Sequence, residues 1–81
     1  MTDEIRYYAI VDDHSSADEP VAVLRRFPPG GGKDESYGPH LQWRFSPLLL
    51  ASERGDTEYD LIPITEERAN QIVARIRDLH H

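Results

Sequence analysis

The chain contains no cysteine, so a disulfide framework and a zinc site built on thiolates are both excluded. This absence matters because a chain of 81 residues is one small domain. A hydrophobic core of that size supplies only about 3–5 kcal/mol of net stability. We therefore treat residues 1–81 as a single domain, and we expect further stabilisation from efficient packing or from a partner subunit.

Long apolar runs are also missing, and the N-terminal sequence MTDEIRYY has no basic start followed by an apolar stretch. No segment approaches the roughly 18 apolar residues that a membrane-spanning helix needs. These absences predict a soluble cytoplasmic protein with no membrane partner. Positive charge is scarce too, since the net charge is -6 and Lys33 is the only lysine. Because negative charge repels phosphates, the composition argues against nucleic acid as a partner.

Four segments have the β-branched and aromatic composition of strands, and polar or proline-containing stretches separate them. They are residues 5–13, 21–27, 41–45 and 58–64. The first segment is apolar on both faces, which predicts a central position in the sheet or a place at an interface. It is expected to pair with the second segment as an antiparallel hairpin. Pro63 predicts that the last strand lies at an edge.

Two helices complete the pattern. Ser46 as N-cap, Pro47 in the first turn and Gly55 as a left-handed stop predict a short helix. Thr65 is expected to cap a longer helix. The apolar face of that helix consists of Ala69, Ile72, Val73, Ile76 and Leu79. The order β-β-β-α-β-α predicts an α+β fold, in which the amphipathic C-terminal helix covers a mostly antiparallel sheet of three to four strands.

The sequence PPGGGK, Pro28 to Lys33, has the glycines and the lysine of a phosphate-binding loop. However, Asp34 follows the lysine where such a loop needs Ser or Thr, and no helix signal comes next. Asp34 and Glu35 would also place negative charge beside a bound phosphate. We interpret residues 28–40 as a flexible, exposed loop, because repeated proline and glycine interrupt every regular pattern.

The sequence DDH, Asp12 to His14, places two carboxylates and an imidazole at the end of the first strand, where metal ions are sometimes held. Neighbouring strand residues point in opposite directions, so the three side chains converge only if the turn bends sharply. The alternative interpretation is a turn in which side chains bind nearby backbone amides. His80 and His81 alone are weak evidence for a metal site, and we predict no metal and no cofactor.

An aromatic and cationic group forms the candidate interaction surface, because Tyr, Trp and Arg dominate binding hot spots. It consists of Tyr37, His40, Trp43 and Arg44. The alternative for Trp43, the only tryptophan, is that it fills the core of a small sheet.

Four segments, YYAIVDD, VLRRF, ERGD and ITEERANQIVARIR, together resemble a group of small, uncharacterised actinobacterial proteins. The resemblance covers most of the chain and is one of overall pattern. It implies a fold and no activity, so no catalytic or binding residue is taken from it.

Three hypotheses for the function follow from the sequence. The first is a small intracellular protein-interaction or regulatory module, acting as a homodimer or with another protein, because the first strand is apolar on both faces and the core is small. The second is a small-ligand or metal-dependent catalytic domain around Asp12, Asp13 and His14, with His40 as a further member. The chain has no Gly-x-Ser-x-Gly elbow and is short for a pocket of about 300 Å³, which argues against an enzyme. The third is an acidic inhibitor of a basic partner.

Overall fold

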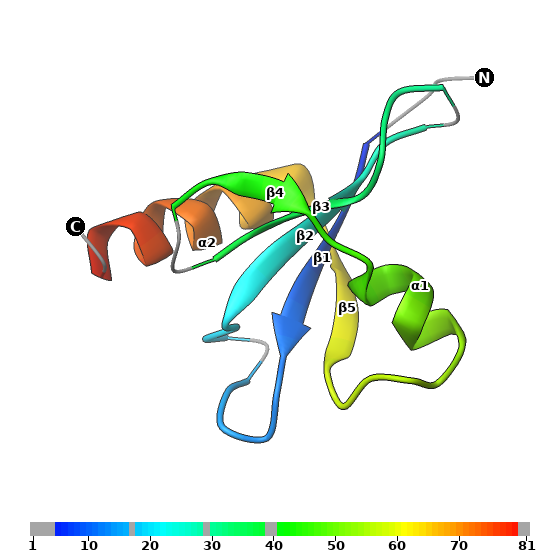
Figure 1. The fold of residues 1–81 in the computed structure, drawn as a ribbon. Coiled ribbons are helices and arrows are strands. Elements are labelled where there is room, and N and C mark those ends of the chain that lie inside the picture. The colour runs from blue at the N-terminus through cyan, green and yellow to red at the C-terminus, as the bar shows by residue number, and fades with distance from the viewer. Residues whose placement is uncertain (1–4, 17, 29, 39–40, 80–81) are drawn as a thin grey trace.

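The computed structural model describes residues 5–16, 18–28, 30–38 and 41–79 of the chain. Within these ranges the helices and strands follow the order β-β-β-β-α-β-α. They are β1 (Arg6–Val11), β2 (Ala22–Arg26), β3 (Glu35–Tyr37), β4 (Trp43–Phe45), α1 (Leu48–Glu53), β5 (Asp60–Ile64) and α2 (Glu66–Leu79). The predicted α+β class is confirmed, and the two helices lie on opposite sides of the sheet (Figure 1).

The strands of the described chain form one five-stranded antiparallel sheet in the order β4-β3-β2-β1-β5. β1 is an interior strand, which agrees with the first of the two predicted alternatives, because Ala9 pairs with Val23 of β2 on one side and with Ile62 of β5 on the other. The predicted hairpin of β1 and β2 is confirmed as well. β5, which contains Pro63, lies at an edge.

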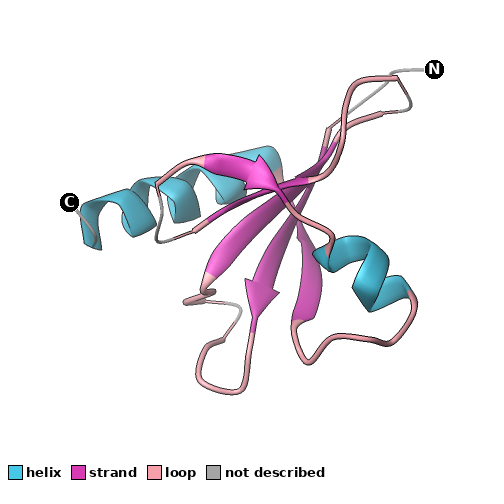
Figure 2. Cartoon of the chain, in the orientation of Figure 1, coloured by secondary structure: helices cyan, strands magenta, loops and turns pink. Residues whose placement is uncertain are grey.

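β3 was missed in the sequence, since it lies inside the segment 28–40 that was interpreted as one irregular loop. For this reason the sheet has five strands instead of three or four. Arg25 of β2 lies opposite Glu35 and bonds it, with 2.6 Å between Nη2 and Oε1. A strand of three residues is too short to show an alternating pattern, and the ion pair that supports it joins distant positions in the sequence. The connection from β2 to β3 projects from the sheet (Figure 2).

The larger hydrophobic core lies between the sheet and α2. Its buried residues are Ala9, Val23 and Tyr37 from the sheet and Ala69, Ile72 and Ile76 from α2. Val73 also packs against this core, as the helical spacing predicted. Leu79 does not, because it is 69% exposed at the end of α2, where the helix extends past the sheet (Figure 1). The prediction is therefore wrong for Leu79 alone.

The start of α2 is capped, and its middle is tied to the connection between β1 and β2. The hydroxyl of Thr65 accepts the backbone N–H of Arg68 at 3.1 Å, which confirms the predicted cap. The guanidinium groups of Arg68 and Arg75 each donate to the carbonyl oxygen of Asp18 at 3.1 Å. Arg75 also pairs with Glu19 at 2.9 Å. These bonds fix α2 to a loop that is distant in the sequence.

A smaller core covers the opposite face of the sheet. Its buried residues are Ile10, Leu24 and Leu49, and the last of these belongs to α1. Because α1 has only six residues, it covers only part of this face. Apart from α1, this side of the sheet carries no second helix in the described ranges.

α1 begins one residue later than predicted. Pro47 stands at the N-cap position and has no capping side chain, but Oγ of Ser46 accepts the backbone N–H of Leu48 at 3.4 Å, a long bond of the kind that the predicted cap makes. Ser46 has a second role, because its backbone N–H donates to the carbonyl oxygen of Asp34 at 2.9 Å and continues the pairing of β4 with β3. Gly55 has φ +74° beyond the helix, which confirms the predicted left-handed stop. Among the helices of the described chain, none has the length and apolar character to cross a membrane.

Candidate functional site

β4 lies at an edge of the sheet, and some of its backbone groups face away from β3. The N–H of Ser46 points toward β3, where it bonds the carbonyl oxygen of Asp34. Backbone groups of successive strand residues point alternately to the two sides of a strand. The backbone N–H and C=O groups of Arg44 therefore also point toward β3, whereas those of Trp43 and Phe45 point outward.

Exposed aromatic and basic side chains accompany these outward groups. Phe45 is 60% exposed, and Nζ of Lys33 lies 5.5 Å from the centroid of its ring. Arg44 is exposed and makes no hydrogen bond or ion pair with any residue that the structure describes. We refer to Lys33, Trp43, Arg44 and Phe45 together as the β4 edge. It combines outward-facing backbone donors and acceptors, an exposed apolar ring and two cations.

Trp43 is half-buried and packs against the larger core, so it connects the β4 edge to the interior. Its ring centroid lies 5.5 Å from that of Tyr37, and the two rings are tilted by 56°. Trp43 has a second contact, in which the guanidinium carbon of Arg25 lies 3.9 Å from the centroid of the Trp43 ring. Arg25 is held in turn by Glu35, which accepts bonds from Nε at 2.9 Å and from Nη2 at 2.6 Å.

Of the four residues of the predicted interaction surface, the three that the structure describes do not share one surface. Tyr37 is 7% exposed and belongs to the core on the α2 side. Trp43 packs beside it, so the core interpretation of this tryptophan holds for one part of the ring and an exposed part remains. Arg44, one position along the strand, points to the opposite face. His40 lies outside the described residues.

Phe45 and Lys33 belong to the β4 edge but were not among the predicted residues. The available signal for Phe45 was its alternation with Trp43, which predicted that both rings lie on one face of the strand. For Lys33 the sequence held no such signal, because its neighbour Phe45 is distant along the chain and the fold alone brings the two together.

The sequence DDH forms a tight turn. Oδ1 of Asp12 accepts the backbone N–H of His14 at 2.9 Å, and the N–H of Asp12 donates to Oγ of Ser15 at 2.8 Å. The bond from His14, followed by the interaction with Ser15, holds the pKa of Asp12 below its ordinary value. These bonds are the ones expected from the alternative interpretation of DDH, a turn in which side chains bind nearby backbone amides. In the part of the chain that the structure describes, no three Asp, Glu, His or Cys side chains are placed to hold a metal ion.

The glycines of PPGGGK shape a turn. The N–H of Gly31 donates to the carbonyl oxygen of Pro28 at 2.8 Å. Gly30 has φ +85° and Gly32 has φ +125°, and residues other than glycine adopt these backbone angles only with strain. The run of glycines is thus explained by backbone conformation.

Arg26 anchors the end of this loop. Its guanidinium donates two bonds of 3.1 Å to the carboxylate of Asp34 and a third of 2.9 Å to Glu53 of α1. Asp34 first, and then Glu53, raise the pKa of Arg26 above its ordinary value. The contacts join β2, the start of β3 and α1. The negative charge that follows Lys33 therefore has a structural role.

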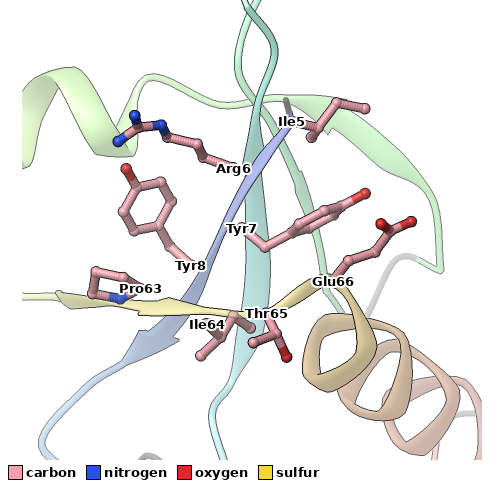
Figure 3. A pocket seen from close by; sticks show the side chains of 8 residues that line it. All are labelled: Ile5, Arg6, Tyr7, Tyr8, Pro63, Ile64, Thr65 and Glu66. Carbon is pink, nitrogen blue, oxygen red and sulfur yellow. The ribbon is translucent and has the colours of Figure 1, made fainter. Parts of the chain in front are cut away.

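A hollow of about 720 Å³ lies where β5 leads into α2 (Figure 3). Arg6 and Tyr8 point to one side of β1, whereas Tyr7 and Glu66 lie on the other side (Figure 3). Because these polar groups diverge, they do not form a common binding site, and we assign no function to this hollow.

Comparisons with known proteins assign no function to the chain. No protein family matches it, and no similar curated protein or solved structure was found.

Proposed function

We propose that the chain is a protein-interaction module, which binds an extended segment of another protein along the β4 edge as an additional strand. The observation that carries this proposal is the outward direction of the N–H and C=O groups of Trp43 and Phe45. In strand addition, main-chain hydrogen bonds supply affinity, and contacts with alternate side chains supply specificity.

The side chains of the β4 edge suggest the composition of the partner segment. In an antiparallel pair with β4, the partner residue opposite Arg44 occupies a position without direct backbone bonds, where Cα atoms are about 4.5 Å apart. An acidic side chain at that position pairs with the guanidinium, which has no other partner among the described residues. The two flanking partner residues lie beside the rings of Trp43 and Phe45. The expected pattern is apolar, acidic, apolar.

The same geometry favours a different protein over a second copy of this chain. Pairing of β4 with itself around a twofold axis at Arg44 places two arginines directly opposite each other, and like charges in this position are destabilising. A shift of register is limited by Leu41, with φ +58°, on one side and by Pro47 on the other. We therefore propose a heterologous partner instead of a homodimer at this edge.

A capped peptide in which valines flank one central glutamate tests the proposal by titration into isotope-labelled protein. We expect the amide signals of Trp43 and Phe45 to shift and their hydrogen exchange to slow. Arg44→Glu should reverse the preference, so that a peptide with central lysine binds better than the glutamate peptide. Phe45→Pro should abolish binding and change the melting temperature little, because its N–H points outward and contributes no bond to β3.

Three results would contradict the proposal. They are equal binding of the glutamate and lysine peptides, wild-type binding by Phe45→Pro, and shifts confined to another part of the chain. Sedimentation velocity of the free protein tests the choice of partner. A dimer that Phe45→Pro dissociates would show that a second copy occupies the β4 edge.

A further inference from the structure

A groove of about 340 Å³ lies on the face of the sheet that α1 only partly covers. Its floor is made of small residues on β2 and at β3, namely Ala22, Ser36 and Gly38. A Cβ atom added to Gly38 would lie 3.5 Å from Cβ of Ala22, which is ordinary contact. The groove exists because no large side chain stands on this part of the sheet.

The walls of the groove are mostly apolar, with a few polar groups. Leu48 of α1 and Tyr59 of the segment before β5 stand on one side, and Gln42 and Arg44 stand on the other. Small-molecule sites have this composition, with apolar walls that bind the body of a ligand and a few polar groups that orient it.

Arg44 differs from the two arginines of β2. Arg25 and Arg26 are paired with carboxylates, whereas Arg44 has no such partner among the described residues. Its planar guanidinium has the fork geometry that binds a carboxylate through two parallel bonds. One end of the groove is therefore suited to an anion.

The other end of the groove is acidic. Asp12 and Tyr59 line both this groove and a neighbouring hollow of about 190 Å³, so the two adjoin. The neighbouring hollow is also lined by Asp13, His14 and Glu58. Since one oxygen of Asp12 accepts the N–H of His14, Asp13 and Glu58 offer the freer carboxylates. This end is suited to a cation.

The distance between the two ends selects the length of a ligand. Arg44 is three strands and four register positions from Asp12, which corresponds to a Cα separation on the order of 20 Å. The arginine and carboxylate side chains reach across part of that distance. The remainder corresponds to about three or four residues of extended chain. A single amino acid is too short.

We propose that this groove binds a short apolar peptide with free ends, its α-carboxylate on Arg44 and its α-ammonium group at the acidic end beside Asp12, where Asp13 and Glu58 adjoin. The small floor residues leave room for the peptide side chains, which lie against Leu48 and Tyr59. This ligand lies on the face of the sheet and makes no backbone bond at the β4 edge, so it binds without strand addition, although both proposals use the Arg44 side chain.

The tetrapeptide Val-Ala-Ala-Val tests this site in its free, C-amidated and N-acetylated forms. We expect the free peptide to shift the amide signals of Ser36, Gly38 and Gln42. Amidation should weaken binding about tenfold in the wild type, because it removes a charge-assisted bond to Arg44. In Arg44→Gln the free and amidated peptides should bind within about twofold of each other. Acetylation should weaken binding in both proteins.

Two further variants complete the experiment. Gly38→Val fills the floor without backbone strain, since Gly38 does not have positive φ, and it should abolish binding while the protein stays folded. Arg54→Gln removes an exposed arginine outside the groove and should bind like the wild type. The proposal is overturned if amidation has the same effect in the wild type and in Arg44→Gln, if Gly38→Val retains binding, or if no signal from the groove shifts.

Discussion

The guanidinium carbon of Arg25 lies 3.9 Å from the centroid of the Trp43 ring. Arg25 belongs to β2 and Trp43 to β4, so this contact reaches across the intervening strand β3. The same guanidinium bonds Glu35 of β3. A strand of three residues has few backbone bonds of its own, and one arginine thus holds both short strands, β3 and β4, to the rest of the sheet.

Arg25→Gln should therefore loosen the β4 edge. We expect a loss of about 1–2 kcal/mol in the free energy of unfolding, because a cation–π contact and an ion pair are both removed. The fluorescence of Trp43 should move to longer wavelength as its ring becomes more exposed to water. Thermal melts and emission spectra measure the two effects. Arg44→Gln is the matched control, and a comparable loss of stability in that variant would contradict this role of Arg25.

Adjacent leucines of α1 should differ strongly in their effect on stability. Leu49 is 6% exposed and packs with Ile10 and Leu24, whereas Leu50 is 45% exposed. Leu49→Ala should lower the free energy of unfolding by about 2–5 kcal/mol, and Leu50→Ala by no more than about 0.5 kcal/mol. Denaturant titration of the two variants provides the measurement. Equal losses would show that α1 does not pack on the sheet as described.

The sequence was sufficient to predict a helix or a strand where the hydrophobic pattern extends over many residues. α2 repeats its apolar face over several turns, and β1 has apolar residues on both faces, so the helix and the central strand were both recognised. Pro63 and Gly55 were interpreted correctly because each has a local effect on the backbone. These signals need no knowledge of which segments meet in space.

The candidate site depends on relations between distant segments, and the sequence does not contain them in readable form. Tyr37 was assigned to a loop surface, whereas its position beside Val23 of β2 puts it in the core. Likewise, the outward direction of the backbone at Phe45 follows from the pairing of β4 with β3. Strand order and register determine both the burial of Tyr37 and the backbone direction at Phe45. They could not be predicted because β3 is too short to be recognised in the sequence.

The turn at Asp12 should titrate at unusually low pH. The pKa of Asp12 is lowered in the folded chain, first by the N–H of His14 and then by Ser15. A lowered folded pKa means that the carboxylate stabilises the fold above its unfolded pKa of about 3.9, and that this stabilisation is lost as the pH falls through the folded value. Ser15→Ala should raise the pKa of Asp12 toward normal. Carboxyl carbon titration by NMR is the measurement, and Ser16→Ala is the control. An unchanged titration of Asp12 in Ser15→Ala would contradict this account.

The free edge of β5 is protected by Pro63. The N–H of Val21 bonds the carbonyl oxygen of Ile10, so Ile10 faces β2 and its neighbour Ala9 faces β5. Ile62, which pairs with Ala9, consequently faces β1, and Pro63 next to it faces outward. The proline therefore removes a donor from the open edge without removing a bond from the sheet.

Pro63→Val should restore that donor and promote edge-to-edge association, because an open apolar strand is a template for further strands. Pairing of this edge with the β4 edge of the next copy does not close on itself, so open-ended assemblies are expected instead of a defined dimer. Sedimentation velocity over a range of concentrations should show a growing distribution for the variant. Pro63→Lys restores the same donor but adds a charge that opposes edge pairing, and it should stay monomeric under the same conditions. If Pro63→Val also stays monomeric across that range, the protective role of Pro63 is wrong. If Pro63→Lys associates as readily as Pro63→Val, then a charge at this position does not oppose pairing at the β5 edge.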